Sequence, residues 1–270
     1  MGLGSDAAGR RLSMRVTVLG CSGGIGRGLN TTSLLIDDDL LIDAGDGLGT
    51  LEVRQMTKLR HVFITHSHLD HICHLPLLAD GLFESLSSSG QHFIVHGLPA
   101  TLQALREHIF NGVVWPDFTV LPTAENPVLR LRAMQPGDVV TLAGRQVQMI
   151  AVNHIVPAVA YCVFDDHSTF AFSGDTGPND SLWEALNAHE GLDLLIVEAA
   201  FPNNMPALSE IAKHYCSDTL AQDLPKLRHS PRIFVSHLKP GSEEQVYQEL
   251  RSLCPERDIG RLFGGEYFDL

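Results

Sequence analysis

The chain has 270 residues, a formal net charge of −13, and 44% hydrophobic and 19% charged residues. This composition is typical of a folded globular protein with a large core, and no apolar run reaches the roughly 18–20 residues of a membrane span. The negative charge argues against a nucleic-acid partner such as tRNA, because no cluster of Lys and Arg is set apart to attract it.

The N-terminal residues 1–13 are Gly-rich and polar, and they lack the apolar segment of a secretory signal. We expect this extension to be disordered and residues 14–270 to form a single domain. The five cysteines are odd in number and scattered, with no Cys-x-x-Cys pair, which indicates free thiols in a reducing, cytoplasmic location.

Breaks at Gly, Pro, Asn and Asp separate short β-prone runs from helix-like stretches. In chain order, the expected strands of the first half are 16–19, 33–36, 40–42, 62–65 and 93–95, and its helices are 69–81 and 99–109. The second half is expected to contain strands 147–152, 158–164, 169–172, 192–197 and 233–235, with helices 181–188, 209–214, 219–227 and 243–253. This order predicts an α/β protein in which two sheets pack face to face with helices outside, an αβ/βα sandwich.

A glycine-rich turn follows the first expected strand. Gly20, Gly24 and Gly26 match the Gly-x-x-x-Gly-x-Gly phosphate-binding turn of short-chain dehydrogenases. That turn requires a helix next, whereas residues 29–36 are β-prone, and no Tyr has a Lys four residues later. We therefore interpret the glycines as a sharply turning loop near the histidine-rich site described next.

The run 65–71 contains His66, His68, Asp70 and His71 directly after an apolar strand. Grouping three imidazoles and a carboxylate at a strand end is costly without a cation, so the run indicates metal binding. Imidazole and carboxylate ligands suit zinc, manganese or iron, and two such ions can activate a water between them.

Three later residues occur in the same kind of setting. His154, Asp175 and His237 each follow an apolar, β-prone run. A rigid sheet can hold such side chains at its strand ends while they converge on one site.

Together these segments resemble the signature of the metallo-β-lactamase superfamily. The resemblance implies two divalent ions, with Zn²⁺ the leading candidate and Mn²⁺ or iron as alternatives. It assigns His66, His68 and His154 to one ion and Asp70, His71 and His237 to the other, with Asp175 bridging them.

Within that superfamily, the chain looks most like the class II cyclic-nucleotide phosphodiesterases. The likeness lies in residues 108–118, 173–178, 198–203 and 237–240. It implies hydrolysis of 3′,5′-cyclic AMP or GMP to the 5′-nucleotide by a hydroxide between two zinc ions, with Asp70 and His214 as catalytic residues and a homodimeric assembly. Two departures stand near the site: His74 replaces a Gly of the family, and residues 213–217 read Lys-His-Tyr-Cys-Ser where the family shows Gly-His-Leu-Thr-Pro.

Several residues near these motifs allow two interpretations. Asp43 can form a turn after a strand or orient a metal-bound imidazole. His214 can be a surface residue or the proton donor to the leaving oxygen. The resemblance also places Asn111 near substrate, whereas His74 can be a helix-surface residue or a substrate contact. Trp115 and Phe118 can be core residues or an apolar wall for a purine.

Other functions remain open on the sequence. One group comprises other hydrolases of the superfamily: a tRNA 3′-processing nuclease, a lactonase or a β-lactamase-like enzyme. The nuclease alternative is weakened by the acidic charge and by Val197-Glu198-Ala199-Ala200, where nucleases usually show His-Glu-Ala-Thr. A non-catalytic metal-binding sensor or scaffold is a further alternative, but all seven expected ligands are present.

Overall fold

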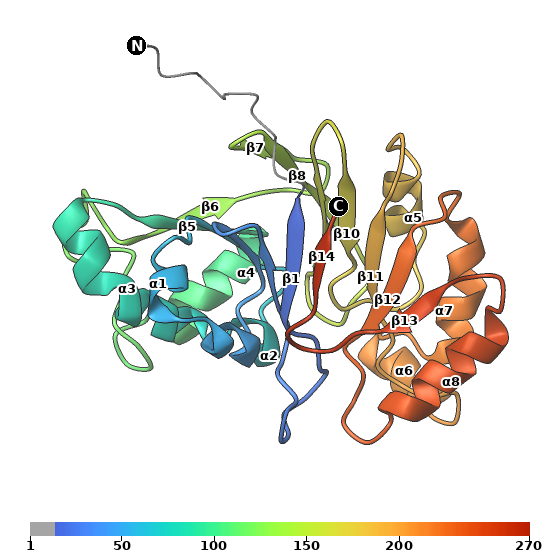
Figure 1. Cartoon of the computed structure of the whole chain (residues 1–270). Helices are drawn as coiled ribbons and strands as arrows, with labels where there is room; N and C mark the ends of the chain where they lie inside the picture. Colours follow the sequence, from blue (N-terminus) through green and yellow to red (C-terminus); the bar gives the residue numbers. More distant parts are fainter. Residues whose placement is uncertain (1–13) are drawn as a thin grey trace, which may run out of the picture.

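Two seven-stranded sheets pack face to face, and helices cover the outer side of each (Figure 1). The computed structural model describes residues 14–270, so the disorder expected for residues 1–13 lies outside the described part. The first sheet has the order β14-β1-β2-β3-β4-β5-β6, and the second has the order β13-β12-β11-β10-β9-β8-β7.

The strands of the first sheet are β1 (Arg15–Gly20), β2 (Ser33–Ile36), β3 (Leu40–Ile42), β4 (His61–Phe63), β5 (Phe93–Gly97), β6 (Leu129–Ala133) and β14 (Tyr267–Asp269). The second sheet contains β7 (Val139–Leu142), β8 (Arg145–Ala151), β9 (Val159–Phe164), β10 (Thr169–Phe172), β11 (Leu194–Glu198), β12 (Arg232–Ser236) and β13 (Ile259–Arg261).

The helices beside the first sheet are α1 (Val53–Met56), α2 (Leu69–Ile72), α3 (Leu75–Ser89) and α4 (Pro99–Ala104), and those beside the second are α5 (Ser181–Leu186), α6 (Pro206–Ala212), α7 (Ser217–Asp223) and α8 (Glu243–Leu253) (Figure 1). Short helical turns occur at η1 (Asp46–Thr50), η2 (Leu105–Ile109) and η3 (Leu224–Lys226). No helix within residues 14–270 is long and apolar enough to cross a membrane.

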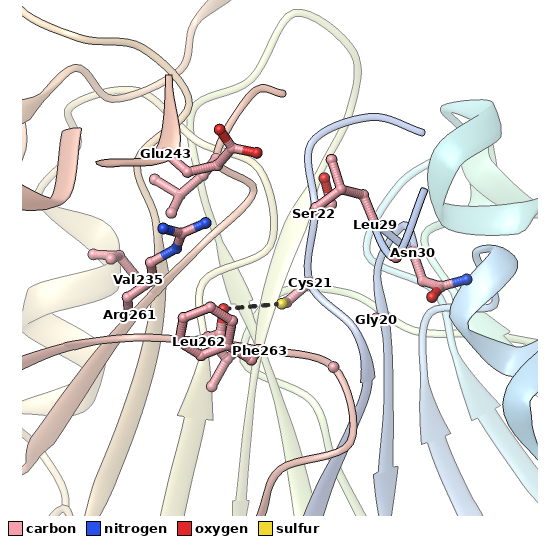
Figure 2. A pocket seen from close by; sticks show the side chains of 13 residues that line it. Gly20, Cys21, Ser22, Leu29, Asn30, Val235, Glu243, Arg261, Leu262 and Phe263 are labelled. Atoms are coloured by element: carbon pink, nitrogen blue, oxygen red, sulfur yellow. Dashed lines mark hydrogen bonds between the residues drawn. The ribbon is translucent and has the colours of Figure 1, made fainter. Parts of the chain in front are cut away.

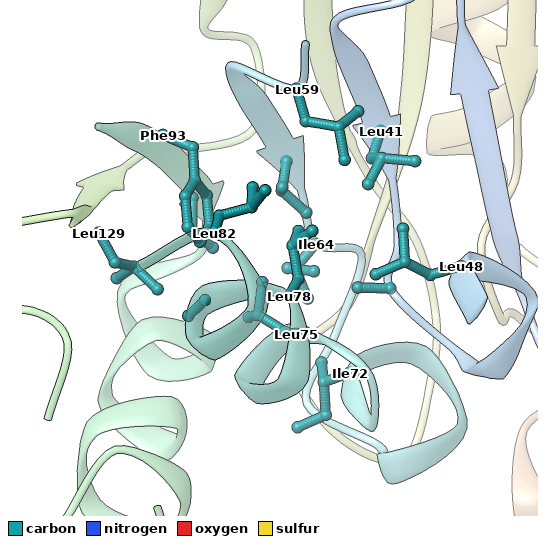
Figure 3. Packing of buried hydrophobic residues seen from close by; sticks show 14 of the residues in the cluster. Leu41, Leu48, Leu59, Ile64, Ile72, Leu75, Leu78, Leu82, Phe93 and Leu129 are labelled. Atoms are coloured by element: carbon teal, nitrogen blue, oxygen red, sulfur yellow. The ribbon is translucent and has the colours of Figure 1, made fainter. Parts of the chain in front are cut away.

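Alternating side chains explain the four layers. In β10, Phe170 and Phe172 join the core between the sheets, while Ala171 faces the helices of the second half. Successive residues of a strand point to opposite faces, so one apolar strand supplies two cores. Figure 3 shows the outer core of the first half, where Leu78 and Leu82 of α3 pack against the sheet. Burying one such leucine side chain instead of leaving it exposed to water stabilises the folded state by about 1.5–3 kcal/mol.

The sandwich expected from the sequence is confirmed, but the helices differ in part. The short α1 was not expected, and the expected helices 99–109 and 219–227 each end in a short helical turn, η2 and η3. The largest difference concerns the helix expected at 69–81. Instead of a single helix over 69–81, the chain forms α2, breaks at Cys73 and His74, and begins α3 at Leu75. Pro76 lies at the start of α3 and lacks an N–H, which favours a helix beginning at that point. The N–H of His74 donates to the carbonyl of Ala44.

The four strands that the sequence did not predict are β6, β7, β13 and β14, and they form the four edges of the two sheets. Edge strands contact fewer neighbours, so their residues carry a weaker apolar pattern. In β7, for instance, a single residue, Val140, is buried. The strands that the sequence did predict begin and end within two residues of the observed ones.

Candidate metal centre

The expected ligands converge because their strands end at the same edge of the sandwich. β10, β11 and β12 are parallel, and β8 runs in the same direction because both β8 and β10 are antiparallel to β9. His154, Asp175 and His237 follow β8, β10 and β12. The run 65–71 follows β4 of the opposite sheet, so both sheets supply the site.

The first group of possible ligands contains His66, His68, His154 and Asp175, whose ligand atoms all lie within 4.8 Å of one another. His68 Nδ1 lies 3.2 Å from His154 Nε2, and His66 Nε2 lies 3.6 Å from Asp175 Oδ2. Three imidazoles and a carboxylate are thus directed at one point, as a divalent ion requires.

The second group contains Asp70, His71, Asp175 and His237 within the same limit. Asp175 Oδ1 lies 3.3 Å from His71 Nε2 and 3.1 Å from His237 Nδ1, and His71 Nε2 lies 3.8 Å from Asp70 Oδ2. Asp175 belongs to both groups and directs Oδ2 towards the first and Oδ1 towards the second, which is the geometry that a bridging carboxylate needs.

Buried polar atoms without a hydrogen-bond partner show whether the two ligand groups suit cations. Among residues 14–270, the buried atoms without a hydrogen-bond partner include His66 Nε2, His71 Nε2, Asp175 Oδ1 and His237 Nδ1. Leaving one such atom unpaired costs about 1–3 kcal/mol. All four belong to the two groups, and their nitrogen and oxygen donors suit divalent transition metals. The cluster is therefore suited to binding divalent metal ions.

The imidazoles are oriented through their other ring nitrogens. His71 Nδ1 is 2.7 Å from Asp43 Oδ2, and the Thr65 hydroxyl donates to the same oxygen at 2.8 Å. Thr65 Oγ1 is also 3.0 Å from His66 Nδ1. His154 Nδ1 is 3.1 Å from the carbonyl of Lys213. Asp43 thus contacts one imidazole directly and another through Thr65, as the orienting interpretation requires.

Burial keeps most of these imidazoles neutral. It places the pKa values of His66 and His237 well below the ordinary value and lowers the pKa of His154 to about 4. Neutral imidazole has the lone pair that binds a metal. His71 differs: burial alone would lower its pKa, but the carboxylates of Asp175 and Asp43 raise it well above the ordinary value.

His214 lies beside the second group and is held by Glu198. Its Nδ1 is 2.7 Å from Glu198 Oε1, and its ring stacks on His237 with centroids 5.1 Å apart. Burial opposes a charge on His214, yet Glu198 raises its pKa. Asp175, Glu198 and His214 form a third possible ligand group, but Glu198 already accepts backbone N–H groups from Thr176 and Ala200. The carboxylate therefore fits an orienting role better than a third ion site.

Sequence reasoning assigned no role to Glu198. A signal was available, because Glu198 ends the apolar run 192–197 in the same way as the expected ligands end theirs. The structure places it fully buried at the end of β11, at the edge where the centre lies.

The four expected substrate contacts lie outside the two ligand groups. Phe118 is 3% exposed and packs on Phe83 and Phe110, and Trp115 packs against the same core. Asn111 stabilises its own loop, because its side chain bonds the backbone at residues 107, 113 and 114. His74 precedes α3, with Nδ1 3.5 Å from Cys73 Sγ. Substrate binding by these residues stays a prediction.

The glycine-rich loop packs against His237, so it lies near the candidate metal centre as expected. A Cβ on Gly23 would lie 2.3 Å from the carbonyl oxygen of His237, so only glycine fits there. Residues 21–32 form no helix, which removes the dinucleotide alternative. A cavity of about 60 Å³ lies beside this loop. Figure 2 shows its lining, in which the Cys21 thiol donates to the carbonyl of Leu262. Burial raises the pKa of Cys21 to about 12, which keeps this thiol protonated at neutral pH.

Residues 39–252 match the family model described as the beta-lactamase superfamily domain. The chain therefore belongs to the metallo-β-lactamase superfamily, and it is a hydrolase of that fold.

Individual relatives show which members of the superfamily the chain resembles. A Yersinia pestis protein named probable 3′,5′-cyclic-nucleotide phosphodiesterase is 25% identical, over 89% of this chain and 82% of its own length. A ribonuclease Z from Acaryochloris marina is 26% identical, over 88% and 79%. The crystal structure of unliganded yeast PDE1 superimposes with a TM-score of 0.81 over 96% of this chain and 100% of that chain, at 18% identity. The expected likeness to cyclic-nucleotide phosphodiesterases is thereby confirmed.

Proposed function

We propose that the protein is a cytoplasmic two-metal phosphodiesterase that hydrolyses 3′,5′-cyclic AMP or GMP to the 5′-nucleotide. The observation that carries the proposal is the pair of His/Asp groups sharing Asp175, with the His214–Glu198 pair directly beside them. The Yersinia relative supports the cyclic-nucleotide substrate by its name. We further propose zinc as the native metal and a homodimer as the assembly.

His66, His68 and His154 would hold one ion, Asp70, His71 and His237 the other, and Asp175 both. When bound, such ions polarise phosphoryl oxygens and lower the pKa of an attacking water. The Asp70 side chain is 30% exposed whereas that of Asp175 is 2% exposed, so Asp70 is the carboxylate better placed to orient water on the substrate side.

His214 would protonate the leaving 3′-oxygen. Its Nδ1 is engaged by Glu198, so Nε2 is the nitrogen that can donate a proton. Glu198 is fully buried and holds the imidazole in place. An alkoxide leaves phosphorus slowly unless it is protonated, and a positioned acid accelerates such a step by about 10²–10⁴-fold.

A tRNA 3′-processing nuclease is the second candidate, favoured by the ribonuclease Z relative. The net charge of −13 argues against it, because long polyanions are repelled by an acidic protein without a basic patch.

The five cysteines are free thiols, which fits the cytoplasmic location that we propose.

The decisive experiment compares substrates on zinc-loaded protein. Hydrolysis of bis-(p-nitrophenyl) phosphate tests phosphodiesterase chemistry, and rates on cyclic AMP, pre-tRNA and nitrocefin then separate the candidates. Turnover of cyclic AMP well above the other two supports the proposal. Metal-loaded protein without activity on any of these would favour the sensor or scaffold alternative.

The His214→Ala variant tests the proton donor. We expect it to keep its metal content while kcat on cyclic AMP falls by about 10²–10⁴-fold. The loss should be far smaller on bis-(p-nitrophenyl) phosphate, because p-nitrophenolate leaves without a proton. Equal losses on both substrates would assign His214 to binding or to structure.

A further inference from the structure

A large cavity opens beside His214 in the second half of the protein. It has a volume of about 590 Å³ and lies between the turn that follows Asp175, helix α6 and the start of α7. Its lining includes Asn153, Pro178, Glu210, Lys213, His214 and Cys216. Pockets of roughly 300–1,000 Å³ are typical of small-molecule sites.

His214 connects this cavity to the metal centre. The imidazole lines the cavity, and it also contacts the rings of His154 and His237 with centroids 4.9 and 5.1 Å away. Because His214 lines the cavity, the cavity offers room for the alcohol portion of a leaving oxygen that His214 protonates. For a cyclic nucleotide, that portion is the nucleoside.

Lys213, which lines the cavity, contacts the candidate metal ligand His154. Lys213 has a φ of 51°, a left-handed conformation that is unusual for a residue other than glycine. Its carbonyl is hydrogen-bonded by His154 Nδ1, and a Cβ on Gly177 would lie only 3.3 Å from its backbone. The same backbone that orients His154 therefore forms this wall, so the cavity is held in a fixed relation to the centre.

The charges of the lining indicate which group would bind. Glu210 and Lys213 are both exposed, and their opposite charges leave the cavity lining without a net charge from these two residues. Asn153 and Thr219 add hydrogen-bonding groups, and two prolines with Cys216 add apolar surface. This mixture suits a neutral, hydrogen-bonding ring system better than a polyanion.

We propose that this cavity binds the nucleoside of the substrate, with the ribose towards His214, in place of the Trp115–Phe118 loop. The ligand class is a purine or pyrimidine nucleoside, free or as part of a phosphodiester. The assignment of the cavity to substrate rests on the proposed function, but nucleoside binding can be measured without catalysis.

The test fills the cavity from its rim. Glu210→Trp places a large side chain in the opening, and Pro206→Trp is a second filling variant that guards against a folding defect specific to the first. Glu184→Trp is the matched control, because Glu184 is an exposed glutamate on α5 outside the cavity. The probe is adenosine, titrated calorimetrically into zinc-loaded protein of verified metal content.

We expect wild type and Glu184→Trp to bind adenosine equally, and both filling variants to bind it at least about tenfold more weakly, since a filled pocket cannot enclose the ligand. The ratio of kcat/KM on cyclic AMP to that on methyl p-nitrophenyl phosphate, which carries no nucleoside, should fall by a similar factor. Trp115→Ala should leave adenosine binding unchanged.

The outcomes separate the two proposals. Absent adenosine binding in wild type, or unchanged binding in both filling variants, overturns the assignment of the cavity. Loss of binding in Trp115→Ala alone would place the base on the Trp115–Phe118 loop. A third outcome is that wild type binds adenosine, the filling variants do not, and wild type does not turn over cyclic nucleotides. That outcome would support the cavity as a nucleoside site and refute the proposed activity.

Discussion

Replacing Asp43 by Asn should loosen both proposed metal sites, although Asp43 belongs to neither ligand group. Its carboxylate is fully buried and accepts three hydrogen bonds: from the Thr65 N–H at 2.8 Å, the Thr65 hydroxyl at 2.8 Å and His71 Nδ1 at 2.7 Å. The first uses Oδ1, and the other two share Oδ2. Asn has the same shape but offers a single acceptor oxygen.

The size of the effect follows from that geometry. If the amide oxygen of Asn replaces Oδ2, its NH₂ opposes the Thr65 N–H. If the NH₂ replaces Oδ2, it opposes His71 Nδ1–H and displaces the ring. The first orientation loses one hydrogen bond, and the second loses the two that share Oδ2. The first is therefore favoured, and losing one hydrogen bond to a charged group costs about 1.5–3 kcal/mol. At about 1.4 kcal/mol per factor of ten, this agrees with the roughly 10–100-fold loss of metal affinity seen when such orienting partners are removed.

The measurement is a titration of metal-free protein with zinc in competition with a chromophoric chelator. We expect both binding steps of Asp43→Asn to weaken, because the Thr65 hydroxyl links Asp43 to His66 of the first group as well as to His71 of the second. The step that involves His71 should weaken more, since that contact is direct.

Asp223→Asn is the matched control. Asp223 is 6% exposed and accepts hydrogen bonds from the Tyr215 hydroxyl at 2.7 Å and from Trp183 Nε1 at 3.3 Å, but it belongs to no ligand group. This variant should lose unfolding free energy and keep its zinc affinity. The reasoning is refuted if Asp43→Asn binds both ions within about twofold of wild type, because an orienting partner would then have no effect.

Two further predictions concern the centre and its surroundings. Asp175→Ala should lose at least one of about two bound ions per chain, because Asp175 belongs to both groups, and elemental analysis checks this; wild-type protein without metal after growth in zinc would contradict the centre itself. Lys213→Gly should raise the free energy of unfolding by up to about 1–2 kcal/mol, because glycine adopts a φ of 51° without strain. Ala143→Gly, at a φ of 47° in the β7–β8 turn, is its control in denaturant unfolding, and a destabilised Lys213→Gly would show that the side chain itself contributes contacts.

The segments that form the two candidate ligand groups could be predicted from the sequence, because in each a His or Asp follows an apolar strand. His154 and His237 are separated widely in the chain, yet each follows the same local pattern. Their strands β8 and β12 run in the same direction within a mixed sheet, so their ends lie at one edge. Glu198 follows the pattern too, but a single carboxylate after a strand has no distinctive spacing. Its relation to His214 appears only in three dimensions.

Burial was the harder property to predict. A Trp-Pro-Asp-Phe run is equally suited to a core and to a ligand wall, and the structure puts Phe118 in the first core. The edge strands were missed for a related reason. Their pairing depends on neighbours that are distant in sequence, so β1 meets β14 although the two lie at opposite ends of the described chain.

Metal binding at the candidate centre would also add to the stability of the whole sandwich, because the candidate ligands come from both sheets. The sheets are joined close to the site: the Tyr161 hydroxyl of β9 donates to the carbonyl of Ile64, and the N–H of Val159 donates to the carbonyl of Thr65. An ion held by His66 and Asp175 together would bind the folded chain and not the unfolded one. Binding must then add to the free energy of unfolding, by an amount set by the free metal concentration. Stabilities of the variants are therefore comparable only at a fixed concentration of free zinc.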